Sequence, residues 1–158
     1  MKTMISFDAD DHRFNLRAAG IFLQDSSVLL HRLEGDAIWA LPGGRVESGE
    51  DAASAVVREL KEEVGEVVRC GELLYVIENF FEYQSKPNHE IGLYFLADLH
   101  PESPLRSICQ SHVGIEGSQR LEYRWFLRSE LHAVNLHPSF LRAALSKPTL
   151  AFEHVVHR

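Results

Sequence analysis

The sequence has few of the residues that mark disulfide-bonded, zinc-binding or membrane proteins. It contains two cysteines, Cys70 and Cys109, without a Cys-x-x-Cys pair, and its nine histidines form no His-x-x-x-His pattern. Zinc-ligand spacing is therefore absent, and free, buried thiols of a cytoplasmic protein are favoured over a disulfide. No apolar run approaches the roughly 20 residues of a membrane helix. The first residues also lack the apolar segment of a signal peptide, so we expect a cytoplasmic location and no membrane partner.

Positive charge is also scarce. Lysine and arginine number 16 against 23 aspartate and glutamate residues, which gives a net charge of −7. Such a chain has no basic field to attract nucleic acid, so we expect no nucleic-acid partner. A length of 158 residues with 45% hydrophobic residues suits one folded domain over residues 1–158, with a substantial core.

The most informative segment covers residues 44–66, GRVESGEDAASAVVRELKEEVGE. Ser48 and Asp51 have the spacing of a capping box that opens a helix, and Gly65 is placed to end it. At about 100° per residue, the three glutamates of the second half fall together on one face. An apolar stripe beside them is expected to anchor the helix in the core; its members are Ala53, Val56, Val57, Leu60 and Val64.

The clustered glutamates cost stability, because Glu59 and Glu63 are like charges four residues apart, worth roughly 0.2–0.5 kcal/mol in an isolated helix. Arg58 precedes Glu62 by four residues and offsets part of this repulsion. A solvated acidic face is the plain alternative. The glycine loop ahead of the helix and the arginine favour instead a site for a hard divalent cation such as Mg²⁺, with Mn²⁺ as a substitute.

The same segment resembles the Nudix box, G-x5-E-x7-R-E-U-x-E-E-x-G-U, in which U is a bulky apolar residue. Gly44, Glu50 and the run from Arg58 to Gly65 fill the fixed positions, and only Glu66 departs, at a position that is usually apolar. On this basis the chain is identified as a member of the Nudix hydrolase family. The resemblance implies an α/β fold: an α/β/α sandwich around a mixed sheet, with the box as a loop, a helix and a loop.

The resemblance also implies a catalytic site. It assigns the cation to the carboxylates of Glu59, Glu62 and Glu63, with the carbonyl of Gly43 as a further ligand. Arg58 is then a residue that orients these carboxylates through ion pairs. Such a site supports hydrolysis of a phosphoanhydride bond, because bound Mg²⁺ polarises the phosphate oxygens and lowers the pKa of the attacking water.

Glu116 is a second candidate for the catalytic machinery. It lies in the long segment of residues 100–118, ahead of a strand that carries Glu122 and Trp125. In many Nudix enzymes a glutamate in this place completes the metal site or acts as the base. A surface glutamate is the alternative, and the two interpretations are evenly matched.

Substrate contacts are less specific. The phosphate-binding candidates are Arg32 and Arg45, with Gly44 allowing close approach of the backbone; the base-stacking candidates are Trp39, Phe81 and Tyr83. Family members that cleave ADP-ribose tend to carry a proline where this chain has Phe81, and dinucleoside polyphosphate members tend to carry a tyrosine near Tyr83. A nucleoside triphosphate, a dinucleoside polyphosphate and a sugar nucleotide all stay open.

The remaining pattern predicts strands around one further helix. Strands are expected at residues 17–24, 28–32, 38–41, 67–76, 78–83, 90–99, 121–126 and 152–156, with a turn at 84–88 and a helix at 138–146. Two functions are consistent with this layout: a Mg²⁺-dependent pyrophosphohydrolase, and a non-catalytic regulatory module that binds a nucleotide. The complete set of box carboxylates favours the enzyme. A homodimer is compatible with either.

Overall fold

The computed structural model describes residues 2–158. Within this range two helices and two 3₁₀ segments accompany nine strands: α1 Ala52–Val64, α2 Leu141–Ala144, η1 Pro104–Arg106 and η2 Arg128–Ala133. The strands are β1 Ser6–Ala9, β2 His12–Gln24, β3 Ser27–Leu33, β4 Gly43–Arg45, β5 Val68–Tyr83, β6 Lys86–Leu99, β7 His112–Glu116, β8 Gln119–Leu127 and β9 Glu153–His157.

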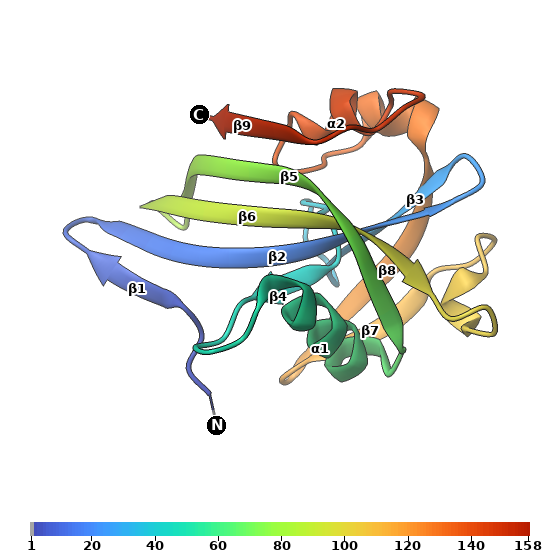
Figure 1. Cartoon of the computed structure of the whole chain (residues 1–158), viewed down its shortest axis with the longest axis horizontal. Helices are drawn as coiled ribbons and strands as arrows, with labels where there is room; N and C mark the ends of the chain where they lie inside the picture. Colours follow the sequence, from blue (N-terminus) through green and yellow to red (C-terminus); the bar gives the residue numbers. More distant parts are fainter. Residues whose placement is uncertain (1) are drawn as a thin grey trace.

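The strands form one mixed sheet in the order β7-β8-β3-β2-β6-β5-β9, with β1 and β4 also paired to β2. The β2–β6 and β5–β9 pairs are parallel, and the other pairs are antiparallel. Figure 1 shows α1 and α2 on opposite sides of this sheet. The α/β architecture expected from the sequence, a mixed sheet between helical layers, is therefore confirmed.

Side chains of β2 alternate between two hydrophobic cores. Ala19 and Ile21 pack in the core that includes Leu141 of α2, whereas Ala18 and Phe22 pack in the core that includes Leu60 of α1. This alternation follows from the period of two in a strand. Because both faces of β2 are covered from Ala18 to Phe22, the sequence of this segment is almost continuously apolar.

Strands β2 and β3 separate soon after their turn, and this separation creates the site. They pair only at Leu23–Val28 and Gln24–Ser27. Further along, β2 pairs with β4 at Ala19–Gly43, and β3 forms a bridge at His31–Ala40. The glycine segment before α1 thus enters between the two diverging strands.

Several sequence-based boundaries are corrected by the structure. The 38–41 strand is reduced to isolated bridges, the 67–76 and 78–83 strands are one continuous β5, and the helix at 138–146 shortens to α2. The 84–88 turn contracts to Gln84 and Ser85, both with positive φ, because β6 already begins at Lys86. The sequence pattern gives no indication of β1, and the long segment of residues 100–118 contains η1 and β7.

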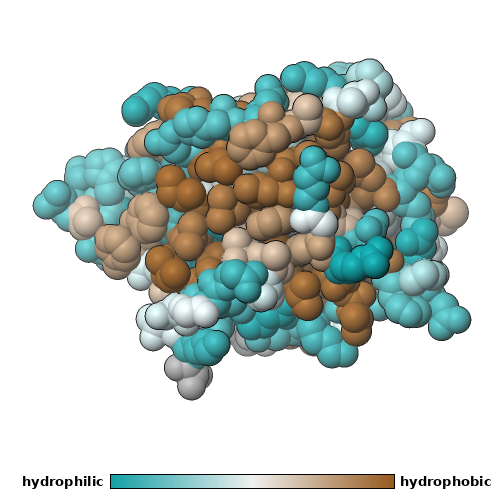
Figure 2. All heavy atoms as spheres, in the orientation of Figure 1, coloured by the Kyte–Doolittle hydropathy of each residue, from teal (hydrophilic) through white to brown (hydrophobic). Residues whose placement is uncertain are grey.

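One face of the sheet is only partly covered. Figure 2 shows apolar side chains gathered over β2, β5 and β6, above α1. Cross-strand partners share a face, so Leu16 lies beside Ile91, and Leu93 lies beside Val76. Phe7 of β1 extends this surface and is 55% exposed. No helix among residues 2–158 is long and apolar enough to cross a membrane.

Candidate active site

Helix α1 presents the box carboxylates. Its N-cap is Asp51, whose carboxylate accepts a hydrogen bond from the backbone N–H of Ser54; the capping box expected from Ser48 is wrong. Gly65 ends the helix in the left-handed region with φ of 72°, as expected. Leu60 is fully buried, but the buried face also includes Glu63, which the helical pattern had placed beside the apolar stripe.

Arg58 lies at the centre of an ion-pair network. Its guanidinium donates to both carboxylate oxygens of Glu50, at 2.8 and 3.1 Å, and to the backbone carbonyl of Arg45 at 3.1 Å. It also donates to Glu59 at 2.9 Å and to Glu62 at 3.1 Å. Bidentate pairing fixes the guanidinium plane. Arg58 therefore ties the loop before α1 to two carboxylates of the helix.

Glu59 and Glu63 form a close carboxyl pair. Their side chains are 13% and 3% exposed. Burial raises the pKa of Glu59 to about 7, helped by repulsion from Glu63 and by a hydrogen bond between the two carboxyls. Burial likewise raises the pKa of Glu63 to about 7, and the charge of Glu116 adds to this shift. Too little positive charge lies beside the pair to hold both groups ionised.

Gly44 makes room for this pair. A Cβ at Gly44 would lie 2.4 Å from the carboxyl carbon of Glu59, so any larger residue here would displace this carboxylate. The glycine of the box thus allows close approach of the carboxylate, and its φ is not in the left-handed region. Glu59 packs directly against the backbone of β4 as a result.

Two residues beside Glu63 give no signal in the sequence. The hydroxyl of Tyr123 in β8 donates a hydrogen bond to Glu63, and desolvation raises the pKa of this tyrosine. Nδ1 of His31 in β3 lies 3.7 Å from the same carboxylate and has no hydrogen-bond partner. Burial lowers the pKa of His31 to about 3, so its imidazole is neutral. Only the β3–β8 pairing brings these residues to α1, and no local motif signals that pairing.

The structure separates the other two candidate carboxylates from this pair. Glu62 is 59% exposed and contacts Arg58 at the helix surface. Glu116 is also exposed, at the end of β7, where it pairs with Gln119, so it is part of a hairpin and not of a loop. Gly114 of the same strand lies against Val64 and the backbone of Glu63, and Glu116 shares the strand face of Gly114, so it lies on the side of the sheet that carries α1.

Arg17 of β2 is a further residue that sequence reasoning missed. Its guanidinium donates to the carbonyl of Leu41 at 2.9 Å. Its positive charge lowers the pKa values of Glu63 and His31, and it opposes the rise that burial causes in the pKa of Glu90. Arg17 is the cross-strand partner of Gly92 and therefore lies on the face of β6 that bears Glu90.

The residues expected to contact substrate differ in their exposure and in their present partners. Arg32 donates to Glu122 at 3.0 Å and lies 4.4 Å from the Trp39 ring centre, so its guanidinium is already engaged. Trp39 is only 6% exposed and packs in the core, which corrects its assignment to base stacking. Arg45 is partly exposed beside the site, while Phe81 and Tyr83 are exposed near the end of β5.

The donor set suits a cation that keeps several water ligands better than a cation enclosed by protein ligands alone. Among residues 2–158, no three His, Cys, Asp or Glu side chains are arranged as a ready-made metal site. Mg²⁺ requires no such cage, since it keeps several waters and is held by one or two carboxylates plus substrate phosphates. Glu59 and Glu63 provide such a pair, with Gly43 at the start of the adjacent β4 and the exposed Glu62 and Glu116 around it.

A mixed sheet with a carboxylate-bearing helix behind a glycine loop defines a protein with the Nudix fold. The chain belongs to the NUDIX domain family, whose model matches residues 14–145. It is similar to a solved ADP-ribose pyrophosphatase from Streptococcus suis, with a TM-score of 0.62, 18% identity and coverage of 90% of this chain and 98% of that one. At this identity the likeness establishes the fold alone.

Two sequence relatives bear names with different substrates. An ADP-ribose pyrophosphatase of Methanocaldococcus jannaschii is 36% identical over 83 residues, which are 51% of this chain and 48% of that protein. An RNA pyrophosphohydrolase of Teredinibacter turnerae is 35% identical over 80 residues, 49% of this chain and 45% of that protein. The chain thus spans about half the length of these relatives.

Proposed function

We propose that this protein is a metal-dependent pyrophosphohydrolase that cleaves a phosphoanhydride bond in a nucleotide-type substrate. The observation that carries the proposal is the buried Glu59–Glu63 pair, held by Arg58 and Tyr123 at the opening between β2 and β3. A buried pair of acidic groups is costly unless a counter-charge enters, and a cation carrying substrate phosphates is such a counter-charge. The test is release of phosphate or pyrophosphate from a panel of nucleotides in the presence of Mg²⁺.

The roles of the residues follow from their contacts. Glu59 and Glu63 would hold Mg²⁺, with Mn²⁺ able to replace it, and the Gly43 carbonyl and Glu62 would add oxygen ligands at the edge. Bound Mg²⁺ supplies charge neutralisation at the phosphates and a lowered pKa of the attacking water. Arg58 and Tyr123 position the carboxylates and need not touch substrate. Arg17 would face the substrate phosphates from β2.

The substrate class is a nucleoside diphosphate linked to a further group. The names of two relatives support this range of substrates, because one is named an ADP-ribose pyrophosphatase and the other an RNA pyrophosphohydrolase. Phe81 and Tyr83 are 36% and 49% exposed, so both are free to stack on a base. We place the enzyme in the cytosol, in accord with the free cysteines, although Cys109 is exposed where a buried thiol was expected.

A homodimer is part of the proposal, with the apolar sheet face as the contact. The chain carries a net charge of −7, yet the charged Glu78 on this face is paired with His154 at 2.7 Å. Two copies that meet through this face therefore bring together mainly apolar side chains (Figure 2). We expect light scattering to give a dimer mass and Leu93→Glu to give a monomer; a wild-type monomer at micromolar concentration would contradict the contact.

Glu116→Gln is expected to lower kcat by about 10²-fold or more, the low end for loss of a general base. KM should change less, because the interaction belongs to the transition state. Steady-state kinetics with Mg²⁺ would measure both constants.

Glu122→Gln is the matched control for this prediction. Glu122 is three residues into β8 and pairs with Arg32 and Arg124, so its loss should affect stability more than turnover. Wild-type kcat in Glu116→Gln would place the base elsewhere, with Glu62, Glu63 and Glu90 as the next residues to replace.

A further inference from the structure

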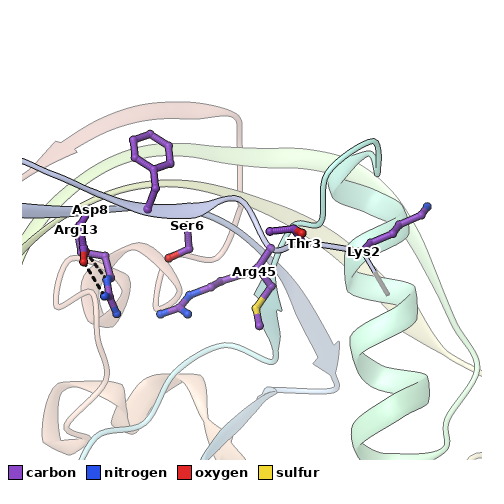
Figure 3. A pocket seen from close by; sticks show the side chains of 8 residues that line it. Lys2, Thr3, Ser6, Asp8, Arg13 and Arg45 are labelled. Atoms are coloured by element: carbon purple, nitrogen blue, oxygen red, sulfur yellow. Dashed lines mark hydrogen bonds and ion pairs between the residues drawn. The ribbon is translucent and has the colours of Figure 1, made fainter.

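A hollow of about 540 Å³ lies beside β4, outside the carboxylate pair. It is bounded by β1, the start of β2 and Arg45. Figure 3 shows the Arg45 guanidinium in the space beneath β1, with Ser6 beside it and the Asp8–Arg13 pair at one end. Lys2 lies at the opposite end with its ammonium group directed away. The polar side chains of two strands and a loop thus share one cavity.

Cations outnumber carboxylates around this hollow. Asp8 is shared between Arg13 at 2.9 Å and Lys86 at 3.0 Å, and the hydrogen bond from Arg13 is the main reason that the pKa of Asp8 falls to about 2. One carboxylate therefore serves two cations. The net charge of the chain is −7, so this local excess of positive charge has the opposite sign to the whole molecule and favours an anionic ligand.

Arg45 adds a cation without a carboxylate partner. Its backbone carbonyl accepts from Arg58, but its guanidinium makes no hydrogen bond or ion pair with any of residues 2–158. Arg45 is the cross-strand partner of Arg17, so both side chains lie on the same face of the sheet. Two arginines in adjacent strands give a pair of planar donors of the kind that recognises phosphate oxygens.

Arg58 links the hollow to the catalytic pair, because its guanidinium donates both to the backbone carbonyl of Arg45 and to the carboxylate of Glu59. Arg45 is also the cross-strand partner of Arg17, on the face of the sheet that bears Glu90. Ser6 lies on the same face, since its hydroxyl donates to Asn15 at 2.7 Å, and Asn15 is the cross-strand partner of Glu90. A phosphate chain held at the Glu59–Glu63 pair would therefore extend toward Arg17 and Arg45.

Resting on the proposed function, we propose that this hollow binds a further phosphate of the substrate, beyond the diphosphate that is cleaved. The substrate is then a nucleotide with three or more linked phosphates, and not a nucleoside diphosphate joined to an uncharged sugar. An additional phosphate gains from Arg45 and from the excess charge of Arg13 and Lys86. A neutral sugar in the same place brings no negative charge and therefore gains far less from these cations.

The kinetic test compares ATP with ADP-ribose in wild type, Arg45→Gln and Arg69→Gln. Arg69 is the matched control, because its side chain is 85% exposed at the start of β5 and its loss changes the net charge equally. Wild type should favour ATP in kcat/KM. Arg45→Gln should lose about tenfold for ATP, mainly in KM, since a charge-assisted contact is removed. The loss for ADP-ribose should be several-fold smaller than the loss for ATP, and equal losses for both compounds would overturn the proposal.

A binding test separates this proposal from the proposed function. Calorimetry with inorganic tripolyphosphate and pyrophosphate would be carried out on the Glu63→Gln protein, with and without Arg45→Gln. Tighter binding of tripolyphosphate that disappears with Arg45→Gln supports the hollow as an anion site. Equal binding of the two anions overturns it. If wild type hydrolyses neither nucleotide while the calorimetric preference holds, the proposed function fails and the anion site stands.

Discussion

Glu63→Gln is expected to lower kcat by about 10²- to 10⁴-fold while the fold is retained. Glu63 is one of two buried carboxyls at the opening between β2 and β3, and glutamine cannot supply its negative charge to a cation. The amide oxygen of glutamine can still accept from Tyr123, so the local hydrogen bond survives. The free energy of unfolding should stay equal or rise slightly, because repulsion with Glu59 four residues away is removed.

Leu60→Ala is the comparison that separates catalysis from folding. Leu60 is fully buried between α1 and the sheet, so its truncation should lower the free energy of unfolding by about 2–5 kcal/mol. Its kcat per folded molecule should change far less than that of Glu63→Gln. Thermal melts and rates would be measured on both variants. A Glu63→Gln protein that melts far below wild type and keeps its specific activity would reverse the two assignments.

Removal of divalent cations is expected to abolish turnover. Within residues 2–158 no lysine or arginine forms an ion pair with Glu63, and Arg58, which pairs with Glu59, is already shared with Glu50 and Glu62. EDTA should reduce hydrolysis to the background rate, and Mg²⁺ or Mn²⁺ should restore it. Binding of Mn²⁺, followed by electron paramagnetic resonance, should weaken in Glu59→Gln independently of any rate. Full activity in excess chelator would exclude the metal role.

Local spacing was enough to predict the helix and its arginine. Arg58 contacts Glu62 because residues four apart on a helix are neighbours, and Gly65 ends the helix because it accepts a positive φ. Local spacing could not show which carboxylates are buried. Glu63 is buried and Glu62 exposed because β8 packs its tyrosine against one side of α1.

Contacts between distant segments were beyond sequence reasoning. Tyr123 lies 60 residues from Glu63, and His31 reaches the same carboxylate only because β3 pairs with β8. The sequence predicts Arg17 only as the first residue of a strand. Nothing near it in sequence indicates that β4 pairs beside it and brings it to the site. The sequence suggests Trp39 as a stacking residue, but it cannot show that Trp39 is buried. That burial depends on Phe126 and on Arg32 and Arg124, of which Phe126 and Arg124 are distant in sequence.

Hydrolysis of a nucleotide panel by wild type and Glu63→Gln, with Mg²⁺ present, tests the central claim most directly. The panel contains a nucleoside triphosphate, a dinucleoside polyphosphate, ADP-ribose and a sugar nucleotide, and the products are separated by ion-exchange chromatography. The account predicts cleavage at a phosphoanhydride bond of at least one compound by wild type, and almost none by Glu63→Gln. If wild type binds these nucleotides but cleaves none of them, the protein is a non-catalytic nucleotide-binding module and the account is contradicted.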